Sequence, residues 1–185
     1  MVEEVLKEAE RKMRKAVDTT GEEFSTVRTG KASTSLLNRV MVDYYGQATP
    51  LNQISSISAP EPSLLIVSPY DKSVVKDVER AILQADLGLN PVSDGHVLRL
   101  PIPKLTEERR KEMIKMVRTR AEEGRVAVRN VRRDVMNDLK ELLKEKLVTQ
   151  DEDRRAQEEI QKLTDRFIAE IEQVLVEKEK ELMQV

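Results

Sequence analysis

Three stretches of the chain place apolar residues three or four positions apart, the spacing that puts them on one face of an α-helix. The first stretch covers residues 2–27, where Thr20 fills a turn that lacks an apolar residue. The second runs from Thr106 to about Leu147, and the third begins at Thr149. Because each apolar stripe must be buried, we expect the three helices to pack as a bundle.

Local signals mark where these helices begin. Thr106 is a good N-cap, and Glu107 and Glu108 after it suit the positive end of a helix dipole. The segment Thr149–Glu152 has the form of a capping box. We expect Gly21 to interrupt the first helix, since glycine in a helix costs about 1 kcal/mol relative to alanine.

The pattern changes between the first two helices. All seven prolines and three of the six glycines lie between Lys31 and Lys104, among short apolar runs. Four of these runs predict strands, at residues 40–45, 54–59, 64–67 and 96–100. Residues 72–85 predict a helix, because their apolar positions share one face. This part of the chain is therefore expected to form a compact α+β module.

The fold class that follows is α+β, mainly α: a three-helix bundle with an inserted small, β-rich α/β domain. The bundle takes residues 1–29 and 105–185, and the inserted domain takes residues 30–104. The inserted domain enters and leaves at neighbouring points, so its two short connections form a predicted hinge, although a rigid pair of linkers is the alternative. The predicted hinge residues are Thr29, Gly30, Lys31, Pro101, Pro103 and Lys104.

Composition narrows the class of protein. Charged residues make up 36% of the chain and aromatic residues 3%, which favours an elongated helical body over a thick core. The net charge of −2 gives no overall basic signal, but it can hide a local patch. The absence of cysteine excludes disulfides and thiolate metal sites. The charged, amphipathic N-terminus is unlike a signal peptide, and we expect a cytoplasmic protein without a membrane segment.

The sequence contains no set of residues typical of an active site. The single histidine, His96, follows the turn residues Asp94 and Gly95, so we interpret it as an exposed turn residue. There is no glycine-rich phosphate loop and no nucleophile elbow. Most carboxylates lie four positions from a lysine or arginine, as on solvated helix faces. We therefore expect no enzyme activity, no catalytic residue, no cofactor and no metal.

Helical phase separates the charges of the second helix into sectors. With Val128 at zero, the apolar stripe centres at about 340°, seven of the basic residues fall at about 40–140°, and the acids fall mostly at about 200–280°. The basic sector contains Arg118, Arg125, Arg129, Arg132, Arg133, Lys111 and Lys115. Glu122 is an exception among the acids, because it falls inside the basic sector.

This arginine face predicts contact with a structured RNA backbone. Arginine binds phosphate in a planar fork and stacks on bases, and structured RNA is recognised largely through shape and phosphates. One alternative is a solvated face whose charges pair with the neighbouring helices, and another is a partner with an acidic groove.

Several long segments, in the same order, resemble bacterial ribosome recycling factors. They are VRTGKAS at the first junction, VDYYGQATPLNQI, ADLGLNP, LTEERRKEM, EEGRVAVRNVRRD and IQKLTDRFI. The resemblance covers essentially the whole chain. The family pattern often has Arg and Pro where this chain has Lys31 and Thr34.

The resemblance implies an L-shaped molecule in which flexible hinges join the bundle to the smaller domain. It also implies a factor that binds the large ribosomal subunit after termination. With elongation factor G and GTP, such a factor splits the ribosome, so that messenger RNA and deacylated transfer RNA can be released. The expected partners are thus the ribosome, through its large-subunit RNA, and elongation factor G, with the chain acting as a monomer.

The resemblance also implies RNA contacts on the bundle at Arg129 and Arg132, and we expect Arg110 and Arg28 to join them. Together with the arginine face, the expected RNA-binding set is Arg28, Arg110, Lys111, Arg118, Arg125, Arg129, Arg132 and Arg133.

Three other interpretations stay open at this point. The bundle could be a protein-only adaptor whose arginines meet acidic residues. The α+β module could carry an enzyme site, although its one histidine argues against that. The apolar stripes could also belong to a dimeric coiled coil.

Overall fold

The structure, a computed structural model, describes residues 1–27 and 29–184. The chain divides into two compact units. The bundle unit consists of Met1–Phe24 and Ile114–Gln184, and the small unit consists of the chain from Ser25 to Met113. The division at Ile114 falls inside a continuous helix. The domain borders predicted at residues 29/30 and 104/105 therefore stay predictions.

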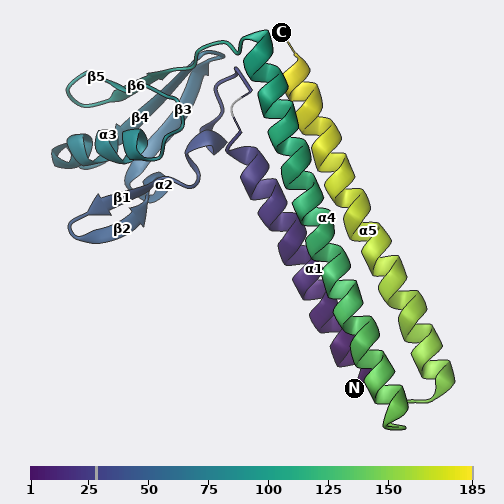
Figure 1. Ribbon diagram of the computed structural model, residues 1–185. Helices are drawn as coiled ribbons and strands as arrows, with labels where there is room; N and C mark the ends of the chain where they lie inside the picture. Colours follow the sequence, from purple (N-terminus) through teal and green to yellow (C-terminus); the bar gives the residue numbers. More distant parts are fainter. Residues whose placement is uncertain (28, 185) are drawn as a thin grey trace. The chain divides into compact units, whose positions relative to one another are not determined.

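Three long helices supply the bundle unit. They are α1 (Val2–Ser25), α4 (Glu107–Lys144) and α5 (Gln150–Met183), and Figure 1 shows them running side by side. The predicted break at Gly21 is wrong, because α1 continues through it. The cost of one glycine is small beside the burial of Val17 and Phe24 on either side of it.

Ion pairs between the helices show their relative directions. Glu10 of α1 pairs with Arg166 of α5, and Arg14, four residues further along α1, pairs with Glu170, four residues further along α5. The two helices therefore run parallel. Partners on α4 and α5 instead change in opposite directions along the chain, as described below, so α4 is antiparallel to α5. The predicted apolar stripes thus face one another within one chain.

The bundle core is built from these stripes. Its fully buried side chains include Met13, Val117, Ala121, Val128, Leu139, Ile160, Phe167 and Ile171. At Gly124 there is no room for a side chain between the helices. A Cβ atom there would lie 2.4 Å from the Thr20 hydroxyl oxygen on α1 and 3.3 Å from Cδ1 of Ile171 on α5. Thr20 itself is buried and donates to the carbonyl of Ala16 at 3.0 Å.

The predicted capping box at the start of α5 is confirmed. The Glu152 amide donates to the Thr149 hydroxyl at 3.2 Å, and the Thr149 amide donates to the Glu152 carboxylate at 2.7 Å. The backbone amide and hydroxyl of Thr149 lower the pKa of Glu152. A carboxylate with a lowered pKa stabilises the fold above its unfolded pKa of about 4.3, and that contribution is lost as the pH falls through the folded pKa.

Replacing Thr149 by alanine should lower the free energy of unfolding by about 0.5–2 kcal/mol, because the amide of Glu152 in the first turn of α5 loses the hydroxyl that caps it. Urea unfolding followed by circular dichroism measures this change. Thr119→Ala is the control, since the Thr119 hydroxyl lies in mid-helix and bonds only the carbonyl of Lys115. An equal loss in both variants would contradict the capping role.

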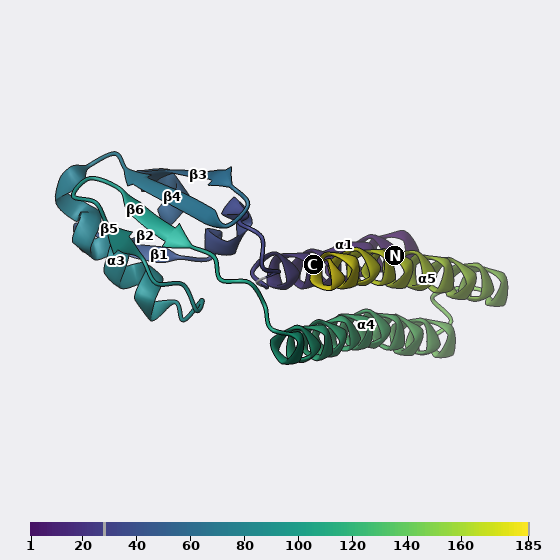
Figure 2. The same cartoon turned by 90° about the horizontal axis from the view of Figure 1, so that it is seen from above.

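The small unit contains two antiparallel sheets (Figure 2). The hairpin of β1 (Met41–Tyr44) and β2 (Gln47–Pro50) forms one of them. The other has the order β3-β4-β6-β5, from β3 (Ser55–Glu61), β4 (Leu64–Pro69), β5 (Val92–Ser93) and β6 (Leu98–Pro101). The helical segments are η1 (Thr34–Leu37), α2 (Leu51–Ile54), η2 (Lys72–Val74) and α3 (Val75–Gln84).

The small unit has its own apolar core, which includes Val42, Leu65, Val67, Val78, Ile82, Leu98 and Leu100. The four predicted strands and the predicted helix are confirmed in place, with shifts of a few residues at their ends. The predicted fold class, a three-helix bundle with an inserted β-rich domain, is confirmed as well. β2, α2, β5 and η1 were not predicted.

The two connections between bundle and sheets approach each other. Gly30 has a φ of +84°, and a Cβ atom there would lie 3.6 Å from the Leu105 amide nitrogen. Of the predicted hinge residues, Thr29, Gly30, Lys31, Pro103 and Lys104 lie outside helices and strands. Pro101 does not: it ends β6, paired with Leu64, and the next residue is anchored by a bond from its amide to the Ser63 carbonyl at 2.7 Å.

Candidate nucleic-acid interface

The arginine face of α4 lies beside α5. Along α4, residues 118, 122, 125, 129 and 132 follow steps of four and three, so they form one line along the helix. The neighbouring stripe of Val117, Ala121, Val128 and Leu139 is fully buried, which anchors this part of α4 in the bundle.

Two arginines of the line are ion-paired to α5. Arg118 Nε lies 2.6 Å from the Glu179 carboxylate, and Arg125 Nη1 contacts the Glu172 carboxylate. The Arg125 side chain is only 17% exposed. Arg118 and Arg125 are seven residues apart, as are Glu172 and Glu179, so these pairs are successive rungs of one ladder like that between coiled-coil helices.

Glu122 is the second residue of the line. It accepts from Arg125 Nε at 2.7 Å and from Arg129 Nη1 at 3.3 Å. The hydrogen bond from Arg125 is the main cause of the lowered pKa of Glu122, with smaller contributions from both arginine charges. Arg118, Arg125 and Arg129 thus meet three carboxylates, from Glu122, Glu172 and Glu179.

The next rung is different. Arg132 is seven residues beyond Arg125, and its Nη1 donates to Gln161 Oε1 on α5 at 3.2 Å. Gln161 in turn donates from Nε2 to Asp165 at 2.9 Å. The group opposite Arg132 is a neutral amide where the other rungs have carboxylates. The charge of Arg132 is therefore not neutralised by a direct ion pair among the described residues.

The other predicted RNA-binding residues fall into three groups. Arg133 is exposed and has no hydrogen-bond or ion-pair partner in the part of the chain that the structure describes. Lys111 pairs with Glu107 at 3.5 Å, one turn away on α4. Arg110 has a buried Nε without a partner among the described residues. Arg28 lies outside the described residues.

The arginine face is thus divided. In the half around Arg118 and Arg125, the charges pair with the neighbouring helix, as the solvated-face alternative has it. In the half around Arg132 and Arg133, positive charge is left for a ligand. Arg129 lies between the two halves and shares the Glu122 carboxylate with Arg125.

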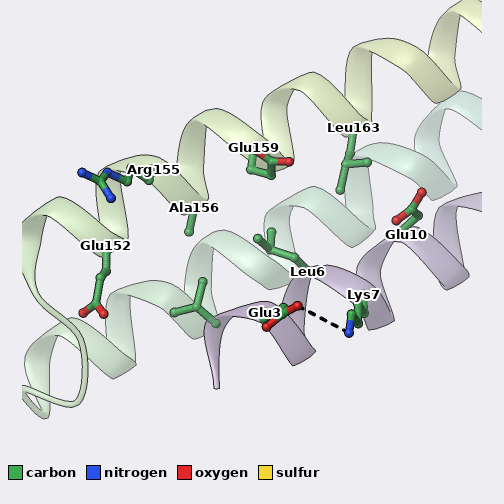
Figure 3. A pocket seen from close by; sticks show the side chains of 10 residues that line it. Glu3, Leu6, Lys7, Glu10, Glu152, Arg155, Ala156, Glu159 and Leu163 are labelled. Carbon is green, nitrogen blue, oxygen red and sulfur yellow. Dashed lines mark ion pairs between the residues drawn. The ribbon is translucent and has the colours of Figure 1, made fainter.

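A groove of about 390 Å³ between α1 and α5 is the other surface feature to consider. Its lining combines apolar side chains, among them Leu6, Ala156 and Leu163, with the glutamates Glu3, Glu10, Glu152 and Glu159 (Figure 3). Three of these carboxylates already have partners: Glu3 pairs with Lys7, Glu10 with Arg166, and Glu152 with its own N-cap. We therefore interpret the groove as space between two helix surfaces. Its carboxylates are not arranged as the acid and base of a catalytic site.

Residues 1–27 and 29–184 contain neither a metal cluster nor a membrane span. No group of three or more potential His, Asp or Glu ligands in this part of the chain is arranged to hold a metal ion. Nor does it contain a helix with the length and apolar character needed to cross a membrane.

Residues 20–183 match the family model described as ribosome recycling factor. The chain belongs to the ribosome recycling factor family. The ribosome-recycling factor of Bacillus subtilis (strain 168) is 54% identical over 185 residues, with both chains covered completely. That of Legionella pneumophila (strain Paris) is 51% identical over the same length, again with complete coverage.

Solved structures of this family also match. The solution structure of a ribosome recycling factor has 42% sequence identity and a TM-score of 0.83, covering 100% of this chain and 98% of that one. A second match is the T. thermophilus ribosome recycling factor, which is described together with E. coli elongation factor G bound to the E. coli post-termination complex. It is 44% identical with a TM-score of 0.70, and both chains are covered completely. The resemblance inferred from sequence is confirmed, and the chain is a translation factor of the recycling step.

The sequence analysis missed the partners of the arginines on α5. The signal was present, because Arg118, Arg125 and Arg132 repeat every seven residues, as do Asp165, Glu172 and Glu179. Two antiparallel helices with matching seven-residue charge repeats are typical of an interhelical ladder. The role of Gln161 has no such signal, since it lies outside the repeat.

Proposed function

We propose that this protein binds the large ribosomal subunit after termination through ribosomal RNA, with the unneutralised part of the arginine face as its main contact. The observation that supports this most is the position of Arg132. Arg132 lies on α4, the longest helix of this chain, and its hydrogen-bond partner on α5 is the Gln161 amide instead of a carboxylate. A guanidinium in that state can give two hydrogen bonds to a phosphate without first breaking an ion pair.

In the proposal, the protein then acts with elongation factor G and GTP to split the ribosome into subunits, which releases messenger RNA and deacylated transfer RNA. Support for this partnership comes from the T. thermophilus factor, which is described with elongation factor G on a post-termination complex. GTP hydrolysis occurs on the partner. The protein makes no covalent change and works as a monomer whose bundle holds the RNA.

Subunit splitting, measured by the decrease in light scattering, tests this function. Post-termination ribosomes are mixed with the purified chain, elongation factor G and GTP. We expect scattering to fall only when all three are present. No fall with an active partner preparation would overturn the proposal.

A protein-only adaptor remains the second candidate, because an acidic protein could also meet Arg132 and Arg133. Co-sedimentation with large subunits distinguishes the two. Binding that survives nuclease treatment of the subunits would favour the adaptor, and binding that is lost would favour RNA.

We also propose that the connections at Gly30 and Pro103–Lys104 act as a hinge through which the partner moves the small unit. Gly30→Ala should slow splitting several-fold while ribosome affinity is kept. Its φ of +84° is a left-handed conformation that costs a side chain about 1–2 kcal/mol, although a Cβ atom has room. Alanine at position 30 would therefore favour another backbone conformation in the connection between α1 and the small unit.

Gly95→Ala is the matched control. Gly95 has a φ of +80° and open space around it, so alanine brings the same strain to a turn within the small unit. Light scattering measures the rate and pelleting measures the affinity. Equal slowing in both variants, or none in Gly30→Ala, would contradict the hinge.

A further inference from the structure

Among the described residues, Gln161 is the one hydrogen-bond partner of the Arg132 guanidinium, which has no ion pair there. Its Oε1 accepts from Arg132 Nη1 at 3.2 Å, and its Nε2 donates to Asp165 Oδ1 at 2.9 Å. The amide therefore joins a cation on α4 to an anion on α5. It is exposed, so burial alone does not determine its orientation.

The bond to Asp165 determines which end of the amide faces the arginine. An ionised carboxylate only accepts hydrogen bonds, so it binds the NH₂ group and turns the carbonyl oxygen of Gln161 toward Arg132. A guanidinium only donates, so the pairing is consistent at both ends. Arg132 is thus held in place by an acceptor that carries no net charge.

A carboxylate at the same place would have a different effect. At the other two rungs, Glu172 and Glu179 contact their arginines directly and neutralise them. A phosphate that approaches such an arginine must displace the carboxylate or meet its repulsion. The chain has this neutralising arrangement at Arg118 and Arg125 but not at Arg132.

We propose that Gln161 is a positioning residue for RNA binding: it orients the Arg132 guanidinium through a neutral acceptor and so leaves its charge for a phosphate. This inference rests on the proposed function. Gln161 itself need not contact RNA in this mechanism. Its contribution is the geometry and the charge state of the arginine beside it.

The decisive variant is Gln161→Glu, which keeps the size of the side chain and adds one negative charge. We expect ribosome binding to weaken on the order of tenfold, the scale of one charge-assisted hydrogen bond. We expect the slope of log affinity against log salt to fall by about 0.9, the value of one phosphate contact. The variant should still fold, because the new ion pair with Arg132 offsets the lost hydrogen bond to Asp165 and the repulsion from its carboxylate; urea unfolding checks this.

Gln157→Glu is the matched control. Gln157 lies one turn earlier on α5 and also donates from Nε2 to an aspartate, Asp153, at 2.8 Å, but it has no arginine partner among the described residues. The Gln157→Glu substitution adds the same charge to the same helix, and it should leave the ribosome affinity and its salt slope nearly unchanged. Gln161→Met separates orientation from charge: it should weaken binding by a smaller factor and leave the salt slope unchanged.

A double-mutant cycle completes the experiment. If Gln161 acts through Arg132, adding Gln161→Glu to Arg132→Ala should cause no further loss of affinity. Equal losses for Gln161→Glu and Gln157→Glu would overturn the inference, as would a Gln161→Glu variant that binds like the parent while Arg132→Ala is weakened. If Arg132→Ala itself binds normally, the proposed RNA contact fails instead, so the two failures are distinguishable.

Discussion

Phe167→Ala is expected to lower the free energy of unfolding of the bundle by about 3–5 kcal/mol, the usual range for removing a buried phenylalanine. The Phe167 ring is 0% exposed in the middle of α5. Two guanidinium groups cover it, with the Cζ atoms of Arg14 and Arg166 at 4.7 Å and 4.8 Å from the ring centre. The variant loses apolar burial, leaves a cavity and removes both cation–π contacts.

The loss should extend to the contact between α1 and α5. Arg14 is held over the ring by two hydrogen bonds to Glu170, at 2.6 Å and 2.9 Å, and the hydrogen bonding of Arg14 is the main cause of the lowered pKa of Glu170. Without the ring beneath it, this pair loses its support. Phe167→Leu should lose much less stability, because it restores most of the buried volume.

The chain offers two spectroscopic probes for this test. All three tyrosines lie in the small unit and there is no tryptophan, so tyrosine fluorescence reports on the small unit. Far-ultraviolet circular dichroism reports mainly on α1, α4 and α5. Urea unfolding of Phe167→Ala should shift the dichroism transition strongly. Ile82→Ala, a fully buried position in the small unit, should instead shift the fluorescence transition. A dichroism shift in Phe167→Ala no larger than in Phe167→Leu would contradict the prediction.

Helix periodicity was sufficient to predict the bundle, for a physical reason. A long helix repeats its buried face many times, so single exceptions such as Gly21 and Thr20 do not hide the pattern. The short elements of the small unit lack this redundancy. β2 has no buried residue, and α2 is a single helical turn, too short for a periodic pattern to mark it. Their conformations are fixed by tertiary contacts, which local spacing does not report.

The candidate site shows the same limit. Helical phase placed the arginines on one face of α4 correctly, since that depends on one helix alone. Which of them are neutralised depends on the register between α4 and α5, which a single helix does not contain. The register separates Arg125, with carboxylates on two sides, from Arg132, with an amide. Whether these residues bind RNA remains a prediction.

The register predicts a gradient of ribosome affinity along the arginine face. Arg132→Ala should weaken binding by about 10–100-fold, since it removes a charge-assisted contact of about 1.5–3 kcal/mol, and it should lower the salt slope by about 0.9. Arg118→Ala should change affinity much less, because its guanidinium already pairs with Glu179. Arg129→Ala should fall between them. Pelleting with ribosomes over a range of salt concentrations measures both quantities.

Arg120→Ala is the control for the gradient, because Arg120 lies on the same helix but pairs with Glu123 and Glu23 on the face toward α1. It should bind like the parent chain, within the range of about 0–1 kcal/mol of an exposed ion pair. If Arg118→Ala weakens binding as much as Arg132→Ala, the carboxylates of α5 must release their arginines on the ribosome, and the charge state of the free protein would not select the contact. If only Arg132 and its neighbours matter, the neutral rung at Gln161 determines which part of the bundle binds RNA.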